Sequence, residues 1–145
     1  MITEDRKLLF KDLCIRLPYN VKIKLEYWYD GQYVTRVFSL NEIDIRFLEN
    51  CCTEGLSTSM GYTDMVVKPY LRPLSSITDE EKEELRKLSV TVSYNGNDEI
   101  IGVQVNTFDK MNICVDFLNS HHFDYRGLIE KGLAIAVTDK DNPYK

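Results

Sequence analysis

The pattern of hydrophobic and polar positions changes from a helical to a strand period early in the chain. In residues 3–17, leucines recur at spacings of three and four, which is typical of an amphipathic helix, and Pro18 ends the segment. Residues 21–29 then alternate apolar and polar side chains. Asp30-Gly31 provides a favoured two-residue turn before a second run at residues 32–40. The pattern therefore predicts a helix followed by a β-hairpin.

The middle of the chain carries weaker signals. Residues 41–52 fit a strand at first and then become ambiguous, whereas residues 54–62 are rich in Ser, Thr and Gly and predict a loop. Residues 63–67 predict a short strand. Two prolines in residues 68–74 exclude a helix there, because each proline restricts the residue before it. We expect an extended connector in that segment; a proline-flanked recognition segment is the alternative.

The second half contains another helix and another hairpin signal. Thr78 begins a capping box, which predicts a helix over residues 79–88. Residues 89–94 and 99–105 flank an Asn-Gly turn and predict a second hairpin.

Three further elements are predicted towards the end of the chain. A helix opens at residue 106 or 107 and runs to about residue 119. Residues 125–131 predict a short helix closed by Gly132, and residues 133–137 predict a last short strand.

Together these elements predict an α+β fold. We expect residues 1–137 to form a single globular domain, in which a mostly antiparallel sheet from two hairpins packs against two to three helices. The N-terminal helix and the helix that ends near residue 119 should cover that sheet. Residues 138–145 form a polar C-terminal tail, which we expect to be frayed.

Composition, charge and the absence of known motifs disfavour several classes of function. The 145 residues carry a formal net charge of -5, which disfavours a protein whose whole surface grips nucleic acid. The spacing of Cys14, Cys51, Cys52 and Cys114 does not fit a zinc site. The sequence contains no phosphate loop, dinucleotide glycine pattern or nucleophile elbow, so we expect no cofactor and no metal.

No apolar run reaches the length of a membrane span and no signal segment is evident. We therefore expect a cytoplasmic protein with reduced thiols and no membrane contact.

One segment holds both histidines of the chain. His121 and His122 stand within five residues of Asp124 and Arg126, and histidine is the side chain best suited to proton transfer near neutral pH. This cluster is the candidate catalytic site of a small enzyme of the hydrolase type. The alternative is structural: a histidine meets the negative end of a helix dipole while Asp124 and Arg126 hold a tight turn. Adjacent histidines point in different directions, which disfavours a shared metal ion.

A second candidate is the run of aromatic residues Tyr27, Trp28 and Tyr29 on the first predicted strand. Aromatic side chains with polar tips are common at interfaces with proteins, so these three residues are candidate binding residues for an unidentified protein partner. Stacking on single-stranded nucleic acid is the alternative use of the same side chains.

Separated blocks of the sequence resemble a known group of proteins. The blocks are residues 68–76, Thr78 with its acidic helix, residues 117–134 and, in part, residues 8–19. They resemble a group of small uncharacterised proteins from gut Bacteroides-type bacteria and from their phages and prophages. The resemblance implies a cytoplasmic accessory protein of phage or mobile-element origin, and it implies no activity. With no catalytic motif in the chain, the leading hypothesis is a non-enzymatic interaction protein that modulates a protein complex.

Overall fold

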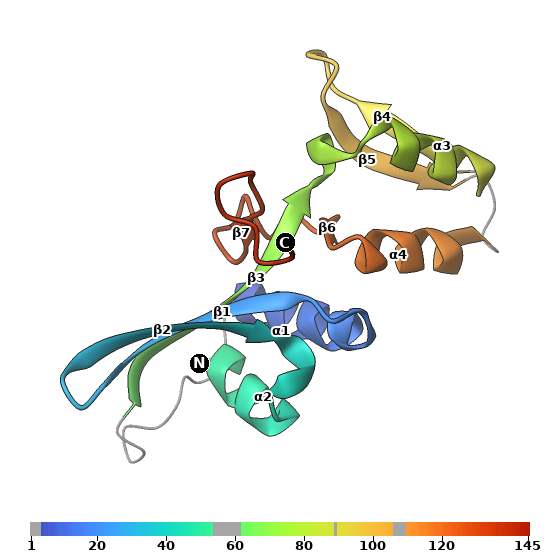
Figure 1. Ribbon diagram of the computed structural model, residues 1–145. Helices are drawn as coiled ribbons and strands as arrows, with labels where there is room; N and C mark the ends of the chain where they lie inside the picture. The colour runs from blue at the N-terminus through green and yellow to red at the C-terminus, as the bar shows by residue number, and fades with distance from the viewer. Residues whose placement is uncertain (1–3, 54–61, 89, 106–109) are drawn as a thin grey trace.

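The computed structural model describes residues 4–53, 62–88, 90–105 and 110–145 (Figure 1), and it confirms the α+β fold class. The helices are α1 (Glu4–Arg16), α2 (Ile45–Thr53), α3 (Asp79–Lys87) and α4 (Met111–Ser120). The strands are β1 (Lys22–Tyr29), β2 (Gln32–Ser39), β3 (Tyr62–Pro73), β4 (Val90–Tyr94), β5 (Ile100–Val105), β6 (Phe123–Asp124) and β7 (Ile135–Ala136).

The first half of the molecule is a sheet covered on one face by two helices (Figure 1). Strand β1 lies between β2 and β3 and is antiparallel to both, which confirms the first hairpin. The alternation along β1 turns Ile23, Leu25 and Tyr27 to the inner face, where they pack in one cluster with Leu13 of α1 and Leu48 of α2. This first core accounts for the apolar period of both the helix and the strand.

The second half has its own core and its own sheet. Strands β4 and β5 confirm the second hairpin, but they form a separate two-stranded sheet. Its apolar residues join those of α3 and α4 around Leu85, Val90, Leu118 and Phe123. The prediction that both hairpins build one sheet is wrong, because the long strand β3 occupies the free edge of β1. Short parallel strands β6 and β7 then pair with β3.

Two segments in the middle differ from the prediction or extend it. Residues 45–53 form helix α2 rather than a strand, because the Asp44 carboxylate caps the helix by accepting the N–H of Arg46 at 2.8 Å. The extended segment predicted at residues 68–74 is confirmed up to Pro73, where it continues the predicted strand at 63–67 into β3, whereas Leu74 begins a short 3-10 helix. The predicted loop at residues 54–62 lies almost wholly outside the described residues, as does the start of the helix predicted from residue 106 or 107.

Residues 125–131 form a hydrogen-bonded turn and no helix. The Asp124 carboxylate accepts the N–H groups of Leu128 and Ile129 at 3.0 and 2.9 Å, which fixes the start of the turn. Gly127 and Gly132 adopt φ values of 75° and 73°, so left-handed residues flank residues 128–131 on both sides. The prediction of a helix is therefore wrong, although Gly132 does close the turn as expected.

The C-terminal residues are packed against the body of the protein. The Tyr144 hydroxyl donates to the carbonyl of Tyr70 at 2.7 Å and accepts the N–H of Lys22 at 3.0 Å. It thereby contacts both β1 and β3, and its ring joins the first core. The prediction that residues 138–145 are frayed is wrong, because this mostly polar segment contains Tyr144, which attaches it to β1 and β3.

Candidate functional site

The two histidines lie at the end of α4 and face different surroundings. The His121 ring stacks on Phe117 with centroids 4.1 Å apart, and its Nδ1 lies 2.9 Å from the Phe117 carbonyl oxygen. His122 follows with a left-handed φ of 63°, and its ring stacks on Tyr144 at 4.1 Å. Its carbonyl accepts the N–H of Arg72 at 2.8 Å. The adjacent rings therefore do not converge on a common point.

Asp124 and Arg126 lie apart from the histidines. The buried Asp124 carboxylate is occupied by backbone N–H groups of its own turn. The Arg126 Nε lies 3.5 Å from the carboxylate of Asp12 on α1. The four candidate residues therefore do not form one site. Each side chain interacts with a different partner: an aromatic ring for the two histidines, backbone N–H groups for Asp124 and the Asp12 carboxylate for Arg126.

The structure adds Ser120, which sequence reasoning missed. Its Oγ lies 3.1 Å from His121 Nδ1, the separation expected for a nucleophile and its base. However, Nδ1 also lies at hydrogen-bond distance from the Phe117 carbonyl, and a carbonyl oxygen can only accept. Nδ1 must therefore carry the proton in that contact, so it cannot take one from Ser120. The arrangement fits a capped helix end better than an activated nucleophile.

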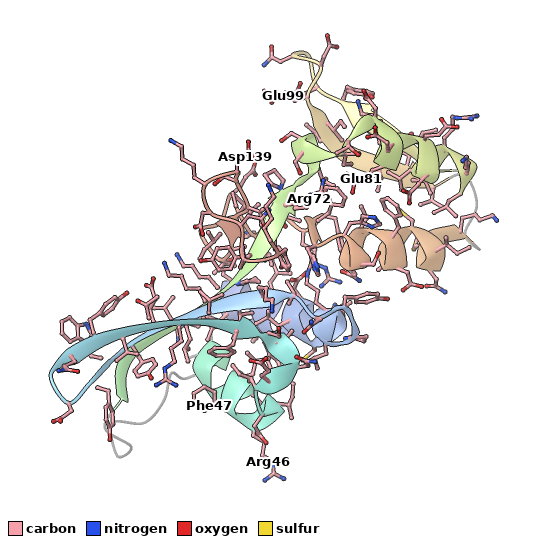
Figure 2. The ribbon with its side chains drawn as sticks, viewed as in Figure 1. Arg46, Phe47, Arg72, Glu81, Glu99 and Asp139 are labelled. Atoms are coloured by element: carbon pink, nitrogen blue, oxygen red, sulfur yellow. The ribbon has the colours of Figure 1, made fainter. Side chains whose placement is uncertain are left out.

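A salt bridge joins β3 to α3 beside His121, and Figure 2 shows Arg72 and Glu81 facing each other. The Arg72 guanidinium donates to both Glu81 oxygens at 2.8 and 2.7 Å, and the Thr78 N–H donates to the same carboxylate at 3.0 Å. Burial alone would raise the pKa of Glu81, but Arg72 and the Thr78 amide hold that pKa below its usual range. His121 Nε2 lies 3.8 Å from this carboxylate.

These groups border a polar cavity of about 590 Å³ between the end of α4, the start of α3 and the C-terminal segment. The cavity walls include Arg72, Thr78, His121, His122 and Tyr144. The charge of Arg72 is already neutralised by Glu81, and His122 and Tyr144 stack on each other. The charges in the cavity wall are therefore paired, whereas the buried Nδ1 of His122 has no hydrogen-bond partner among the described residues.

Three further cavities lie elsewhere on the surface. One of about 340 Å³ adjoins the Asp124 turn and the start of β5. One of about 210 Å³ lies over Lys24, Glu26 and Lys68. The third, of about 280 Å³, is an apolar groove between β5 and α4. The residues lining them form no convergent set of acid, base and nucleophile.

The predicted binding residues Tyr27, Trp28 and Tyr29 do not share one surface. Tyr27 is only 7% exposed and belongs to the first core, whereas Trp28 is 43% and Tyr29 is 47% exposed. Trp28 faces away from the core and meets Tyr33 of β2, with ring centroids 5.4 Å apart. Sequence reasoning missed Tyr33, although a two-residue turn at Asp30-Gly31 places residues 28 and 33 opposite each other.

Apolar side chains gather around this pair on the outer face of the sheet, opposite α1 and α2. We define the outer patch as Trp28, Tyr33, Val37 and Val66, whose exposures range from 41% to 52%. The register places all four on the same face of β1, β2 and β3. Such a cluster of half-exposed apolar groups on one sheet face is the main surface feature of the first half.

Charged residues of the central strand β1 lie within the outer patch. The register places Lys24 opposite Val37 and Glu26 opposite Val66, and the two charged side chains form an ion pair at 3.0 Å. The Tyr33 hydroxyl donates to Glu26. The Tyr33 hydroxyl and then Lys24 lower the pKa of Glu26, so this carboxylate stays ionised next to the apolar groups. The outer patch therefore combines exposed apolar groups with one paired charge.

Metal ligation and membrane insertion find no support in the residues that the structure describes. No three His, Cys, Asp or Glu side chains among them are placed to hold one ion. None of the described helices has the length and apolarity that crossing a bilayer requires. Cys14 and Cys114 are free thiols, and burial raises the pKa of both.

Comparison of the chain with models of protein families, with curated proteins and with solved structures found no match. The functional argument therefore rests on the geometry described above.

Proposed function

We propose that this protein is a non-enzymatic interaction protein that binds a partner protein through the outer patch. The observation that carries the proposal is the exposure of Trp28, Tyr33, Val37 and Val66 on one face of a hydrogen-bonded sheet. Tryptophan and tyrosine are enriched among the residues that dominate binding energy at protein interfaces. The sheet holds these side chains in place before binding, which lowers the entropy cost of association.

A protein partner suits this patch better than single-stranded nucleic acid does. Two of its four residues are aliphatic and offer no stacking platform. The nearby Lys24 is already paired with Glu26, so it adds little free positive charge. The net charge of -5 also opposes binding to phosphates. The proposed role is that of a cytoplasmic accessory protein, of phage or mobile-element origin, that modulates a complex of the host or of the phage.

The proposal is tested by a double substitution away from β2. Trp28→Ala with Val66→Ala removes one aromatic and one aliphatic group from the outer patch. Tyr94→Ala with Ile101→Ala is the matched control, because those residues are 49% and 59% exposed on the other sheet. A partner is first captured by cross-linking from a Bacteroides-type lysate and then titrated in purified form. We expect the first variant to weaken its Kd by about tenfold or more and the control to leave it unchanged. Equal affinities of the two variants would contradict the proposal.

The nucleic-acid alternative has a direct readout, because Trp28 is the only tryptophan of the chain. Its fluorescence can be followed during titration with single-stranded oligonucleotides at low salt. We expect no change. Quenching that disappears as salt is added would identify the outer patch as a nucleic-acid surface instead.

A further inference from the structure

Strand β2 is a long and regular edge strand. It ends the strand order β2-β1-β3-β6, and it pairs with β1 over all eight of its residues without a bulge. Most of its residues are exposed. Proteins usually protect such an edge with Pro, Lys, a bulge or an inward-pointing charge. Strand β2 has no Pro, no Lys and no bulge. Its only charged residue is Arg36, which lies opposite Leu25 on the inner face and is the one protective charge of this edge.

The turn determines which groups β2 offers at its free edge. Asp30 and Gly31 both have positive φ, 51° and 77°, as in the two-residue turn of a tight hairpin. In such a hairpin the residues that flank the turn, Tyr29 and Gln32, form a hydrogen-bonded pair, and hydrogen-bonded pairs recur at every second residue. The even-numbered residues of β2 therefore bond to β1. The N–H and C=O groups of Tyr33, Thr35 and Val37 point outward.

We propose that β2 pairs with β2 of a second copy of this chain, antiparallel and centred on Thr35. In this register Thr35 lies opposite Thr35 of the second copy, and Tyr33 lies opposite Val37 in both directions. Thr–Thr pairs and pairs of aromatic with β-branched residues are favourable across antiparallel strands. The edge is thus complementary to itself, which is what a twofold interface requires.

Charge selects this register over its neighbour. Antiparallel pairing must keep outward-pointing residues opposite outward-pointing residues. Under this condition seven residues of β2 pair only when the register is centred on Thr35 (residues 32–38) or on Arg36 (residues 33–39). The register centred on Arg36 would place two guanidinium groups directly opposite each other, and like charges in that position are destabilising. Centring on Thr35 instead places Arg36 opposite Val34, which is half-buried at the border of the first core.

A second copy fits the edge better than a free peptide does. Peptides that add to a sheet edge gain specificity from pockets that receive alternate side chains. None of the four cavities described above is lined by a residue of β2. The side chains of Tyr33 and Val37 lie on the outer face, so pairing would join the two outer patches into one continuous surface. The dimer does not depend on the proposed function, because the edge and the outer patch are tested by different residues.

Sedimentation of the full chain over a range of concentrations tests the dimer. The wild type should reach twice the chain mass of 16.9 kDa. Thr35→Lys and Thr35→Glu each place like charges across the twofold axis, so each variant alone should be monomeric. An equimolar mixture of the two should recover the dimer, because Lys then faces Glu. This recovery also shows that both variants fold. Thr91→Lys, an exposed threonine on β4, is the matched control and should remain dimeric.

Three results would overturn the proposal. A wild type that stays monomeric at every concentration would leave β2 as an unpaired edge or as a site for a different strand. A dimeric Thr35→Lys variant would place the interface elsewhere, for example at the groove between β5 and α4. A mixture that stays monomeric, although both variants show native circular dichroism, would exclude pairing centred on Thr35.

Discussion

The two halves of the molecule use the same motif, a β-hairpin packed against two helices, and expose different surfaces. In the first half, β3 extends the hairpin into a wider sheet, so α1 and α2 cover one face and the outer patch remains on the other. In the second half the hairpin stays two-stranded, and its apolar residues turn towards α3 and α4. The comparison shows that the third strand widens the surface available for binding, because the hairpin supplies Trp28, Tyr33 and Val37 and β3 adds Val66.

The junction between the halves is polar, unlike the two cores that it joins. Arg16 of α1 is fully buried, pairs with Asp12 at 2.7 Å and donates to the Phe123 carbonyl at 2.7 Å. Phe123 belongs to the second core, so this guanidinium ties one half to the other. Arg72 lies over the Phe123 ring at 4.2 Å and continues the contact towards Glu81. The halves are therefore joined by groups whose pairing is directional.

The strongest test of this junction is Arg16→Met. The substitution leaves the fully buried Asp12 carboxylate with only the more distant Arg126 and removes the donor to Phe123. Breaking a buried ion pair from one side costs about 3–5 kcal/mol, and urea unfolding should show a loss of that size. Asp12→Leu added to Arg16→Met should recover part of the loss, because no fully buried charge is then left unpaired; Arg126, which also loses Asp12, keeps 20% of its side chain exposed. A loss below about 1 kcal/mol, the value of an exposed pair, would show that the halves do not depend on this contact.

The pH dependence of stability tests the contact between α4 and the C-terminal segment. Burial, followed by the charges of Arg16, His121 and Arg72, lowers the pKa of His122 from 6.5 to about 4. The unfolded chain binds this proton below pH 6.5 and the folded protein does so only near pH 4. Stability is therefore full above pH 6.5 and falls as the pH drops from 6.5 towards 4. We expect His122 to account for about 1–2 kcal/mol of that fall, allowing for its partial exposure.

His122→Asn is the variant for this measurement, because asparagine tolerates the left-handed φ of 63° and does not titrate. The free energy of unfolding of this variant should fall less between pH 6.5 and 4 than that of the wild type. His121→Asn is the control and should keep most of the fall that His122 causes, because burial rather than the charge of His121 is the main cause of the lowered pKa of His122. An unchanged fall in the His122→Asn variant would assign the pH dependence to other groups.

The smallest expected effect is confined to the second half. Thr78→Ala removes the capping box of α3, in which the Thr78 hydroxyl accepts the N–H of Glu81 at 3.2 Å. Losing such a cap costs about 1 kcal/mol. Hydrogen exchange should increase in α3 while β1 remains as protected as in the wild type. Equal increases in both elements would mean that the two halves open as one unit.

Sequence reasoning succeeded where one signal is local and unambiguous. The turn at Asp30-Gly31 and the capping box at Thr78 are each recognised within a few residues, and both are confirmed. It failed at residues 45–53, where the apolar spacing also fits a strand and Asp44 was not recognised as a cap. It failed again at residues 125–131, because the Asp124 carboxylate competes for the N–H groups that a helix would use.

The candidate sites were predicted less well than the fold. The alternation along β1 identified Trp28 as facing away from the core, and it also assigned Tyr27 to the inner face. Grouping Tyr27 with Trp28 by proximity in sequence contradicted that alternation. The histidine segment is conspicuous in composition, but only one of its partners is close in sequence. Phe117 precedes His121 by one helical turn, a spacing that a predicted helix brings together. Glu81 and Tyr144 come from distant parts of the chain, and no spacing rule within the segment could have identified them.

The sequence by itself determined the elements whose signals are periodic or local: the N-terminal helix, both hairpins, the capped helix and the α+β class. Tertiary structure decided which strand completes the first sheet, which histidine is buried and where the last tyrosine anchors. The physical reason is the distance along the chain over which the deciding interactions act. Periodicity, turns and caps depend on neighbours within a few residues, whereas sheet order and desolvation depend on groups far apart in the chain. The outer patch and the free edge of β2 follow from that second kind of contact.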